Sequence, residues 1–305
     1  MKNSEYTRLI EELKDSKVSW KKFKSKLDVL NQLQKYLNNQ QEKSPSHLKH
    51  KWSPIYRGQK DFSWTLKTTL ERSPFSASLS LNRYHALAIK ARELYSKLIE
   101  DPVLDPKKIH QYPYENGVQD SISFLLSGNN LINKVPDCLR FWLFLRHYGF
   151  PSPFLDWSKN PLIAAFFAFH KPSAAEFVSV HVLLQGSSGS SGANLIVVDD
   201  TSGDDSDIWL RRHKEQESVY TLFYREYNNR TREKISVFES HEEMLKQNSA
   251  IPYPSEIVFK FEIPAKERMK VLQDLDSDGI NAAKLLADTD ARLETVHNKL
   301  AFMEK

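Results

Sequence analysis

The apolar residues of this chain change their spacing along its length, and this change restricts the fold more than any other feature. Near the N-terminus they recur every three to four residues, as at Trp20, Phe23 and Leu27, which is typical of an amphipathic helix. At residues 256–263 they alternate with polar residues, which is typical of a strand with one buried face. Helical patterns dominate the front of the chain, and strand patterns concentrate in its middle and late parts. This distribution predicts an α+β fold rather than regular βαβ alternation.

Shorter patterns predict the remaining elements. Strands are expected at residues 52–56, 154–157, 176–184 and 194–198. Helices are expected at residues 81–100, 133–146, 162–169, 266–275 and 281–300, and a loop at residues 40–51. Gly149 and Pro151 are expected to end the helix that precedes them.

The composition indicates a protein that folds around its own core. Of 305 residues, 40% are hydrophobic and 11% are aromatic. The net charge is only +4, so bulk charge does not indicate nucleic-acid binding. The single cysteine, Cys138, excludes a disulfide framework and fits a reducing compartment. Residues 1–17 are charged throughout, and no apolar window approaches the roughly 18 residues of a membrane span. We therefore expect a soluble cytoplasmic protein with no membrane partner.

Residues 186–192 have the sequence Gly-Ser-Ser-Gly-Ser-Ser-Gly. Such a strict glycine and serine repeat is typical of a flexible linker. We interpret it as an engineered replacement of a loop, and it carries no weight in the functional assignment.

The first candidate site segment is Tyr56-Arg57-Gly58-Gln59, followed by Trp64. The chain has only nine glycines, so one beside an arginine suggests a tight turn or a close approach to a ligand. A guanidinium next to it can bind a phosphate or carboxylate through two hydrogen bonds. The alternative is a structural arginine that binds loop carbonyls at a strand end.

The second segment runs from Arg146 to Ser158. His147 and Tyr148 stand at a predicted helix end, where a histidine can bind a ligand or simply interact with the last carbonyls. Asp156 enters an apolar region and needs a partner, which we expect to be Arg57, Arg146 or His147, unless Asp156 helps to cap the next helix.

Two further residues of this second segment also have two interpretations. The Trp157 ring suits stacking on a base or nicotinamide, or packing in the core. Ser158 is a candidate N-cap for the helix that follows.

The third segment covers residues 211–221. Its charged start, which includes Arg212, is expected to be a solvated loop, and Val219 and Tyr220 are strand-like. Polar groups at the end of such a strand are well placed to meet a ligand, although a charged hairpin would have the same pattern. Gln216 and Glu217 lie between these two parts. The chain contains no dinucleotide-binding glycine motif, P-loop, HExxH or CxxC signature, so we expect no metal site.

In this order and spacing, the three segments resemble the FRG domain, which is named for its Phe/Tyr-Arg-Gly motif. The first family pattern is matched by residues 56–59, 64–66 and Arg72. The second, a histidine-aromatic-glycine run into Leu-Asp-Trp-Ser and a Phe/Ala-rich helix, is matched by residues 147–168. The third is matched more weakly within residues 212–221, with Ser218 in place of a glycine. The resemblance covers roughly residues 20 to 290.

The FRG family is in turn distantly similar to ADP-ribosyltransferases, and this similarity implies a fold and a site. The fold would be a single α+β domain at residues 51–290 with a mixed or antiparallel β core. A helical region at 1–50 would pack on it, and residues 291–305 would end the C-terminal helix.

By the same resemblance, Arg57 would hold the pyrophosphate or ribose of NAD, Ser158 would support the nicotinamide end, and Gln216 with Glu217 or Glu215 would complete the catalytic site. The residues expected to contact NAD are Tyr56, Gly58, Gln59, His147, Tyr148, Asp156, Trp157 and Arg212.

The resemblance thus implies an NAD-dependent ADP-ribosyltransferase that acts as an intracellular toxin or anti-phage effector. NAD would be the co-substrate, the acceptor would be RNA, or else DNA or protein, and an antitoxin would be a partner. A basic rim that includes Arg72 and Arg212 would suit a nucleic-acid acceptor, although a solvated face explains it equally well. The alternative is a non-catalytic nucleotide-binding or interaction module on the same scaffold.

Overall fold

The structure is a computed structural model. It describes residues 4–42, 52–74, 80–98, 137–147, 149–185, 194–198, 208–228, 234–249, 256–286, 295–296 and 298. The proposed linker at 186–192 and the expected ligand residue Tyr148 lie outside these ranges.

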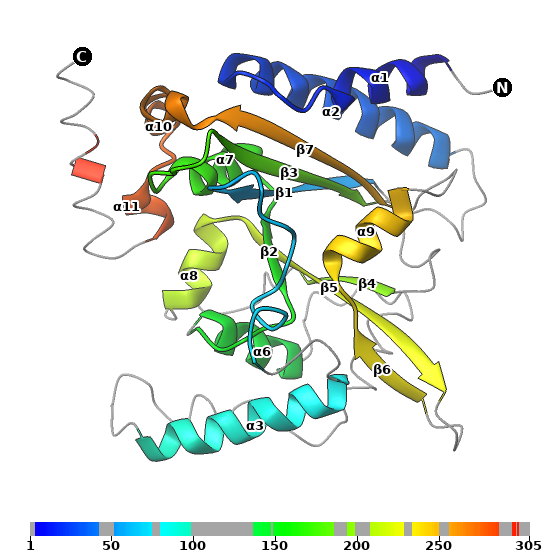
Figure 1. Ribbon diagram of the computed structural model, residues 1–305, viewed down its shortest axis with the longest axis vertical. Helices are drawn as coiled ribbons and strands as arrows, with labels where there is room; N and C mark the ends of the chain where they lie inside the picture. The colour runs from blue at the N-terminus through cyan, green and yellow to red at the C-terminus, as the bar shows by residue number, and fades with distance from the viewer. Residues whose placement is uncertain are drawn as a thin grey trace.

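One antiparallel sheet forms the centre of the described part of the chain (Figure 1). Its strands are β1 (Ser53–Gln59), β2 (Leu155–Ser158), β3 (Phe177–Gln185), β4 (Asn194–Val198), β5 (Ser218–Asn228), β6 (Lys234–Phe238) and β7 (Glu256–Pro264). They are ordered β4-β5-β2-β1-β3-β7, and β6 pairs with the later part of β5. The predicted α+β class with an antiparallel core is confirmed.

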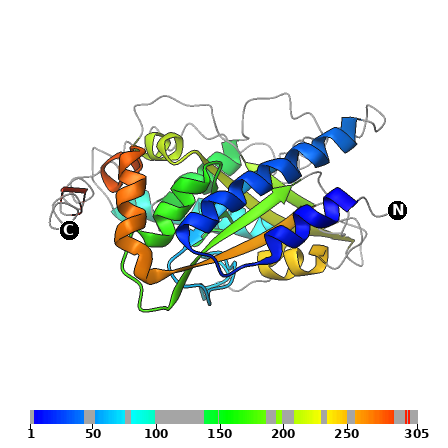
Figure 2. The ribbon, with the colours of Figure 1, turned by 90° about the horizontal axis from the view of Figure 1, so that it is seen from above.

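Helices cover both faces of this sheet. They are α1 (Ser4–Lys14), α2 (Trp20–Glu42), α3 (Leu81–Leu98), α6 (Asp137–His147), α7 (Pro161–Phe169), α8 (Ile208–Glu215), α9 (His241–Ser249), the short 3₁₀ helix η2 (Ala265–Glu267), α10 (Arg268–Ser277) and α11 (Ala282–Leu285). Helices α1 and α2 lie side by side across the sheet above β7 and β3, and the first turn of α2 lies next to α7 and α10 (Figures 1 and 2). Among the described residues, no helix combines the length and the apolar character needed to cross a bilayer.

Three hydrophobic clusters hold these layers together. The largest joins the inner faces of α1, α2, α7 and α10 to β1, β3 and β7, and it includes Phe23 and Phe261. A second joins α3 and α6 to β5 around Tyr84, Trp142 and Phe154. The third joins β1, β2 and β5 to α9 and contains Trp157. Each cluster includes residues of β1, β2 or β5, so these three strands are packed against helices on both faces of the sheet.

Most predicted elements are present, with four differences. The charged start of the third segment is helix α8 and not a loop or hairpin. Helix α2 continues to Glu42, into the predicted loop. Strand β6 and helix α9 were not predicted. The helix predicted at 281–300 begins as the four-residue α11, and residues 295–296 and 298 are also helical. Helix α8 has few apolar residues in its second half, so its sequence lacks the periodicity that identifies an amphipathic helix.

Candidate functional site

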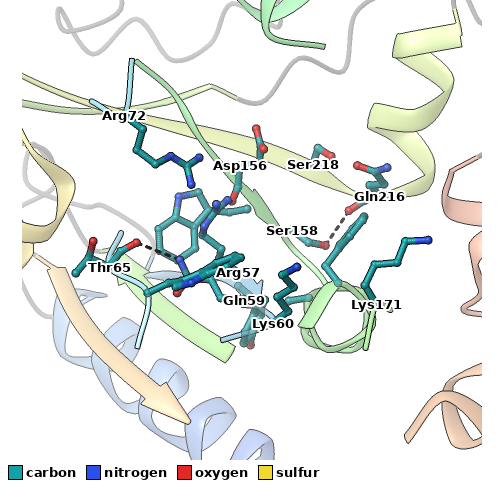
Figure 3. A pocket seen from close by; sticks show the side chains of 16 residues that line it. Arg57, Gln59, Lys60, Thr65, Arg72, Asp156, Ser158, Lys171, Gln216 and Ser218 are labelled. Carbon is teal, nitrogen blue, oxygen red and sulfur yellow. Dashed lines mark hydrogen bonds between the residues drawn. The ribbon is translucent and has the colours of Figure 1, made fainter. Parts of the chain in front are cut away.

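A pocket of about 390 Å³ opens where β1, β2, α7 and the turn before β5 meet (Figure 3). It is lined by residues from all three sequence segments singled out above, including Arg57, Ser158 and Gln216. The strand order explains this meeting, because β2 lies between β1 and β5 in the sheet. The volume falls in the range of small-molecule sites, roughly 300–1,000 Å³.

Arg57 is held at the junction of β1 and β2. Tyr56 is in register with Ser158, and just past this pair the Arg57 guanidinium reaches across to β2. Its NH1 donates to the backbone carbonyl of Asp156 at 2.7 Å. Its Nε is buried and has no hydrogen-bond partner in the structure. The side chain therefore has a structural bond to a carbonyl and also keeps an N–H group for a further acceptor.

Burial lowers the pKa of Arg57 to about 10, with the nearby charges of Arg146 and Arg72 acting in the same direction and Asp156 opposing them. Because this pKa is still well above 7, the guanidinium remains a cation at neutral pH. A half-buried cation with an unused donor favours binding of an anion.

Asp156 is paired with Arg146, one of its three expected partners. Both Nε and NH2 of Arg146 donate to the Asp156 carboxylate. Burial by itself would raise the pKa of Asp156, but the charges of Arg146 and Arg57 outweigh it, and the pKa lies below its ordinary value. Asp156 is therefore an ionised carboxylate engaged by Arg146, and this excludes it as a free general base.

Ser158 connects β2 to the turn that carries Gln216. Its hydroxyl donates to the backbone carbonyl of Gln216 at 2.8 Å and accepts from the backbone N–H of Asn160 at 3.0 Å. The N-cap of α7 is Asn160, whose Oδ1 accepts from Leu162 N at 2.9 Å. The suggestion that Ser158 caps this helix is wrong, because Asn160 lies closer to the first free N–H groups of α7. Ser158 instead fixes the position of Gln216.

Gln216 and Glu217 lie in different surroundings. Gln216 lines the pocket, and its Nε2 donates to the carbonyl of Leu285 at 2.9 Å. This bond uses one N–H of Nε2, so the carboxamide oxygen and the second N–H are the polar groups that Gln216 can offer to a ligand. Glu217 is exposed, has a left-handed backbone with φ of 46°, and accepts from Asn160 Nδ2 at 3.0 Å. Of the three neighbours weighed for the catalytic position, Glu215, Gln216 and Glu217, the pocket is lined by Gln216.

Gly58 is explained by helix packing. A Cβ atom at this position would lie 1.9 Å from the carbonyl oxygen of Ala164 and 2.7 Å from the N of Ala168. Helix α7 thus rests directly on the backbone of β1, a contact that only glycine permits. The close approach expected here is that of α7, although Gly58 also lines the pocket.

Tyr56 and Gln59, the other residues of this motif near Gly58, are both buried. Tyr56 is buried in the main core and lines the pocket. Gln59 is buried, its Nε2 donates to the carbonyl of Thr65 at 3.2 Å, and its Oε1 lies 3.0 Å from His181 Nε2. Burial lowers the pKa of His181 to about 3, so this ring is neutral and its Nε2 carries the proton given to Gln59.

Trp157 lines the pocket but belongs mainly to the interior. Its side chain is only 3% exposed, and its Nε1 donates to Thr221 Oγ1 at 2.7 Å. Of its two interpretations, packing in the core is therefore the one that describes its position, because a stacking ring must present a face to the ligand.

His147 and Arg212 do not line the pocket. His147 Nε2 lies 2.9 Å from the hydroxyl of Tyr220, and burial lowers the pKa of His147 to about 4. Arg212 Nε donates to the carbonyl of Leu286 at 2.8 Å. Both side chains support the elements around the site, and in the structure neither is placed to contact a ligand in this pocket.

The pocket is rich in positive charge that the motifs alone do not reveal. Besides Arg57, the cationic side chains that line it are those of Lys60, Arg72 and Lys171 (Figure 3). Asp156 is the one carboxylate among the described lining residues, and Arg146 already neutralises it. Arg72 belongs to the first FRG pattern and Lys60 is next to its Tyr-Arg-Gly-Gln part, whereas Lys171 follows α7 without any recognisable pattern. The net effect is a pocket suited to an anionic ligand.

A comparison with known protein families identifies part of the chain. Residues 52–176 match the family model of the FRG domain. This match confirms the FRG resemblance for the first two segments, which supply β1, β2 and α7; the third segment, with Gln216, lies beyond it. No curated protein and no solved structure matches the chain.

Proposed function

We propose that this FRG-domain protein is an NAD-dependent ADP-ribosyltransferase whose site is built around Arg57, Ser158 and Gln216. The observation that carries the proposal is the buried, unpartnered Nε of Arg57 in a cation-rich pocket. The resemblance to ADP-ribosyltransferases implies an arginine, a serine and a glutamate or glutamine on three strands. Here β1 and β2 carry the first two, and Gln216 lies in the turn two residues before β5, which is the neighbour of β2 in the same sheet.

The lining residues fit the chemistry of NAD. A pyrophosphate carries two negative charges, and guanidinium and ammonium groups are its usual partners. Arg57, Lys60 and Arg72 supply such groups within one pocket. Arg57 is the anchor among them, because its position is set by the bond to the Asp156 carbonyl before any ligand arrives.

Gln216 is the residue proposed to act at the reacting centre. ADP-ribosyl transfer breaks the bond between nicotinamide and ribose, the bonding electrons leave with nicotinamide, and positive charge develops on the sugar. An oxygen or nitrogen of the acceptor then forms the new bond to the same sugar carbon and loses its proton to solvent. A fixed oxygen close to that charge stabilises it. The amide oxygen of Gln216 is the proposed group for this role, and the bond from its nitrogen to Leu285 holds the carboxamide in place. Ser158 is a positioning residue, since its hydroxyl holds the backbone of Gln216.

A specific observation favours the alternative of a non-catalytic nucleotide-binding module. An amide oxygen carries less negative charge than a carboxylate, and the carboxylate that lines the pocket, that of Asp156, is engaged by Arg146. Under this alternative the pocket would bind NAD or ADP-ribose without breaking the nicotinamide bond. Binding and turnover therefore have to be measured separately.

The test combines nicotinamide release from NAD, transfer of labelled ADP-ribose to total RNA or lysate protein, and the shift of the unfolding temperature by ADP-ribose. We expect wild type to be active in all three and Arg57→Ala to lose release and transfer by at least about 100-fold, because the anion anchor is removed. Arg8→Ala, an exposed arginine on α1, is the matched control and should behave as wild type.

Each other outcome has a defined meaning. Full activity of Arg57→Ala would refute the site. An ADP-ribose shift with neither release nor transfer, in folded wild-type protein, would replace the transferase by the binding module.

We further propose that the activity serves as an intracellular toxin or anti-phage effector that modifies a nucleic acid, RNA first, or a protein, and that an antitoxin restrains it. Support comes from the resemblance alone. The same Arg57→Ala variant provides the check: expression of wild type should arrest growth and the variant should not, and the labelled fraction of the lysate should identify the acceptor.

A further inference from the structure

Trp64 is an exposed aromatic residue at the same pocket. It follows β1 and lines the pocket with Arg57, yet 45% of its surface is exposed. The other tryptophans whose side chains the structure describes are buried: Trp20, Trp52, Trp142 and Trp157. When a ligand covers a large exposed ring at the edge of a pocket, apolar surface is removed from water, and this favours binding. Trp64 is therefore a candidate contact surface.

The segment that carries Trp64 is held in a defined conformation. The backbone N–H of Phe62 donates to the carbonyl of Phe177 at 3.2 Å, and the two rings pack edge to face. Two residues after Trp64, the N–H of Leu66 donates to the carboxylate of Glu242 at 3.0 Å. The backbone is thus tied down on both sides of Trp64, and the exposed ring is presented without a large ordering cost on binding.

The positive charges beside Trp64 indicate what class of ligand its ring would contact. The ammonium of Lys60 lies 5.6 Å from the centroid of the Trp64 ring, and both residues line the pocket with Arg57 and Arg72. An aromatic face next to cations is the combination that binds nucleotides, because the base stacks on the ring and the phosphates meet the cations. Trp157, the other tryptophan at the pocket, is too buried to serve this purpose.

The arrangement of the pocket assigns a position to each part of the ligand. Figure 3 shows Thr65, the neighbour of Trp64, and Arg72 on one side, Gln216 on the other, and Arg57 between them. If the phosphates lie at Arg57 and the reacting bond lies toward Gln216, the remaining ring of the dinucleotide falls on the side of Trp64.

We propose that Trp64 is the stacking surface for the adenine ring of the nucleotide and that Lys60 binds the adjacent phosphate. The identity of the ligand rests on the proposed function. The stacking role rests on the exposure and charge surroundings of Trp64.

The experiment compares wild type with Trp64→Ala and Trp64→Phe by calorimetric titration with ADP and by competition with ribose 5-phosphate, which carries a phosphate but no base. Trp64→Ala should weaken ADP binding roughly 10- to 100-fold, the range found when a stacking aromatic is removed. Trp64→Phe should retain most of the affinity, and ribose 5-phosphate should bind all three proteins alike. ADP should also quench tryptophan emission in wild type more than in Trp64→Phe.

Leu94→Ala, which removes a similarly exposed apolar side chain from α3, is the matched control and should leave ADP binding unchanged. Unchanged ADP affinity of Trp64→Ala would overturn the proposal. An equal loss of ribose 5-phosphate binding by Trp64→Ala would also overturn it. The same holds if Trp64→Ala weakens the binding of single-stranded oligoadenylate RNA but not that of ADP.

Nicotinamide release, measured on the same proteins, separates the two proposals. If ADP binding depends on Trp64 but no nicotinamide is released, the transferase proposal is refuted and the adenine subsite is supported. Release by a Trp64→Ala variant with full ADP affinity would remove the subsite and leave the transferase.

Discussion

At the scale of single residues, the site depends on which of several similar side chains faces the pocket. Gln216 and Glu217 are adjacent in the chain, and both suit a developing positive charge by their chemistry. The left-handed backbone of Glu217 and its bond to Asn160 direct it to the surface, whereas Gln216 lines the pocket. The proposal that Gln216, and not Glu217, is the catalytic group rests on this turn geometry.

This assignment predicts a large difference between two neighbouring alanine variants. Gln216→Ala should lower nicotinamide release from NAD by about 100-fold, the typical loss when one stabilising group is removed from a reacting centre. Glu217→Ala should remain within about threefold of wild type, because its side chain is outside the pocket. Initial rates at saturating NAD measure both. An equal loss in the two variants would contradict the assignment.

At the scale of secondary structure, the contact between β1 and α7 forms the wall of the pocket. Helix α7 begins at Pro161 after the Asn160 cap and buries most of its apolar residues. Gly58 permits its backbone to rest on β1. The glycine of the Tyr-Arg-Gly motif therefore sets the distance between the strand that carries Arg57 and the helix that follows Ser158.

Gly58→Ala is expected to destabilise the protein by about 3 kcal/mol or more, at the upper end for overpacking, because the new methyl group meets backbone atoms that cannot rotate away. Urea unfolding followed by circular dichroism measures this change in the free energy of unfolding. The comparison variant is Gly149→Ala at the end of α6, where φ is +84° and no atom lies within 4 Å of the new Cβ. It should cost only about 1–2 kcal/mol. A smaller effect at Gly58 than at Gly149 would show that α7 does not press on β1.

At the scale of the whole molecule, buried neutral histidines link stability to pH. Burial lowers the pKa of His147 to about 4 and those of His181 and His241 to about 3. In the unfolded chain each has an ordinary pKa near 6.5. The unfolded state therefore binds protons first as the pH falls, so stability is complete above about 6.5 and is lost progressively toward the folded values.

We expect the free energy of unfolding to be several kcal/mol smaller at pH 5 than at pH 7.5, since each histidine contributes up to about 1.4 kcal/mol per pH unit below 6.5. Asp156 and Glu242 have lowered pKa values, and their contribution is lost only in more acidic solution. Urea midpoints across this range provide the measurement, and His181→Gln should reduce the slope. Equal stability at both pH values would mean that these histidines bind protons as readily in the folded state as in the unfolded chain.

Much of the fold could be predicted from the sequence because its signals are local. The alternation at β7 and the uncharged apolar run of α7 identify these elements from neighbouring residues alone. Gly149 ends α6 as predicted, with its N–H and that of Phe150 bonded back to carbonyls of the last turn. Helix α8 and strand β6 were missed or misassigned, because the charged residues of α8 and the short length of β6 give weak periodic patterns.

The candidate site, like the fold, was predicted only in part from the sequence. The sequence by itself determined which residues belong together, since the FRG motifs contain Arg57, Asp156 and Ser158. Only the tertiary structure decided what each one does. It paired Asp156 with Arg146, placed α7 on Gly58, buried Trp157 and left Trp64 exposed. The physical reason is that backbone patterns act over a few residues, whereas ion pairs, packing and exposure depend on partners brought together from distant parts of the chain by the order of the strands.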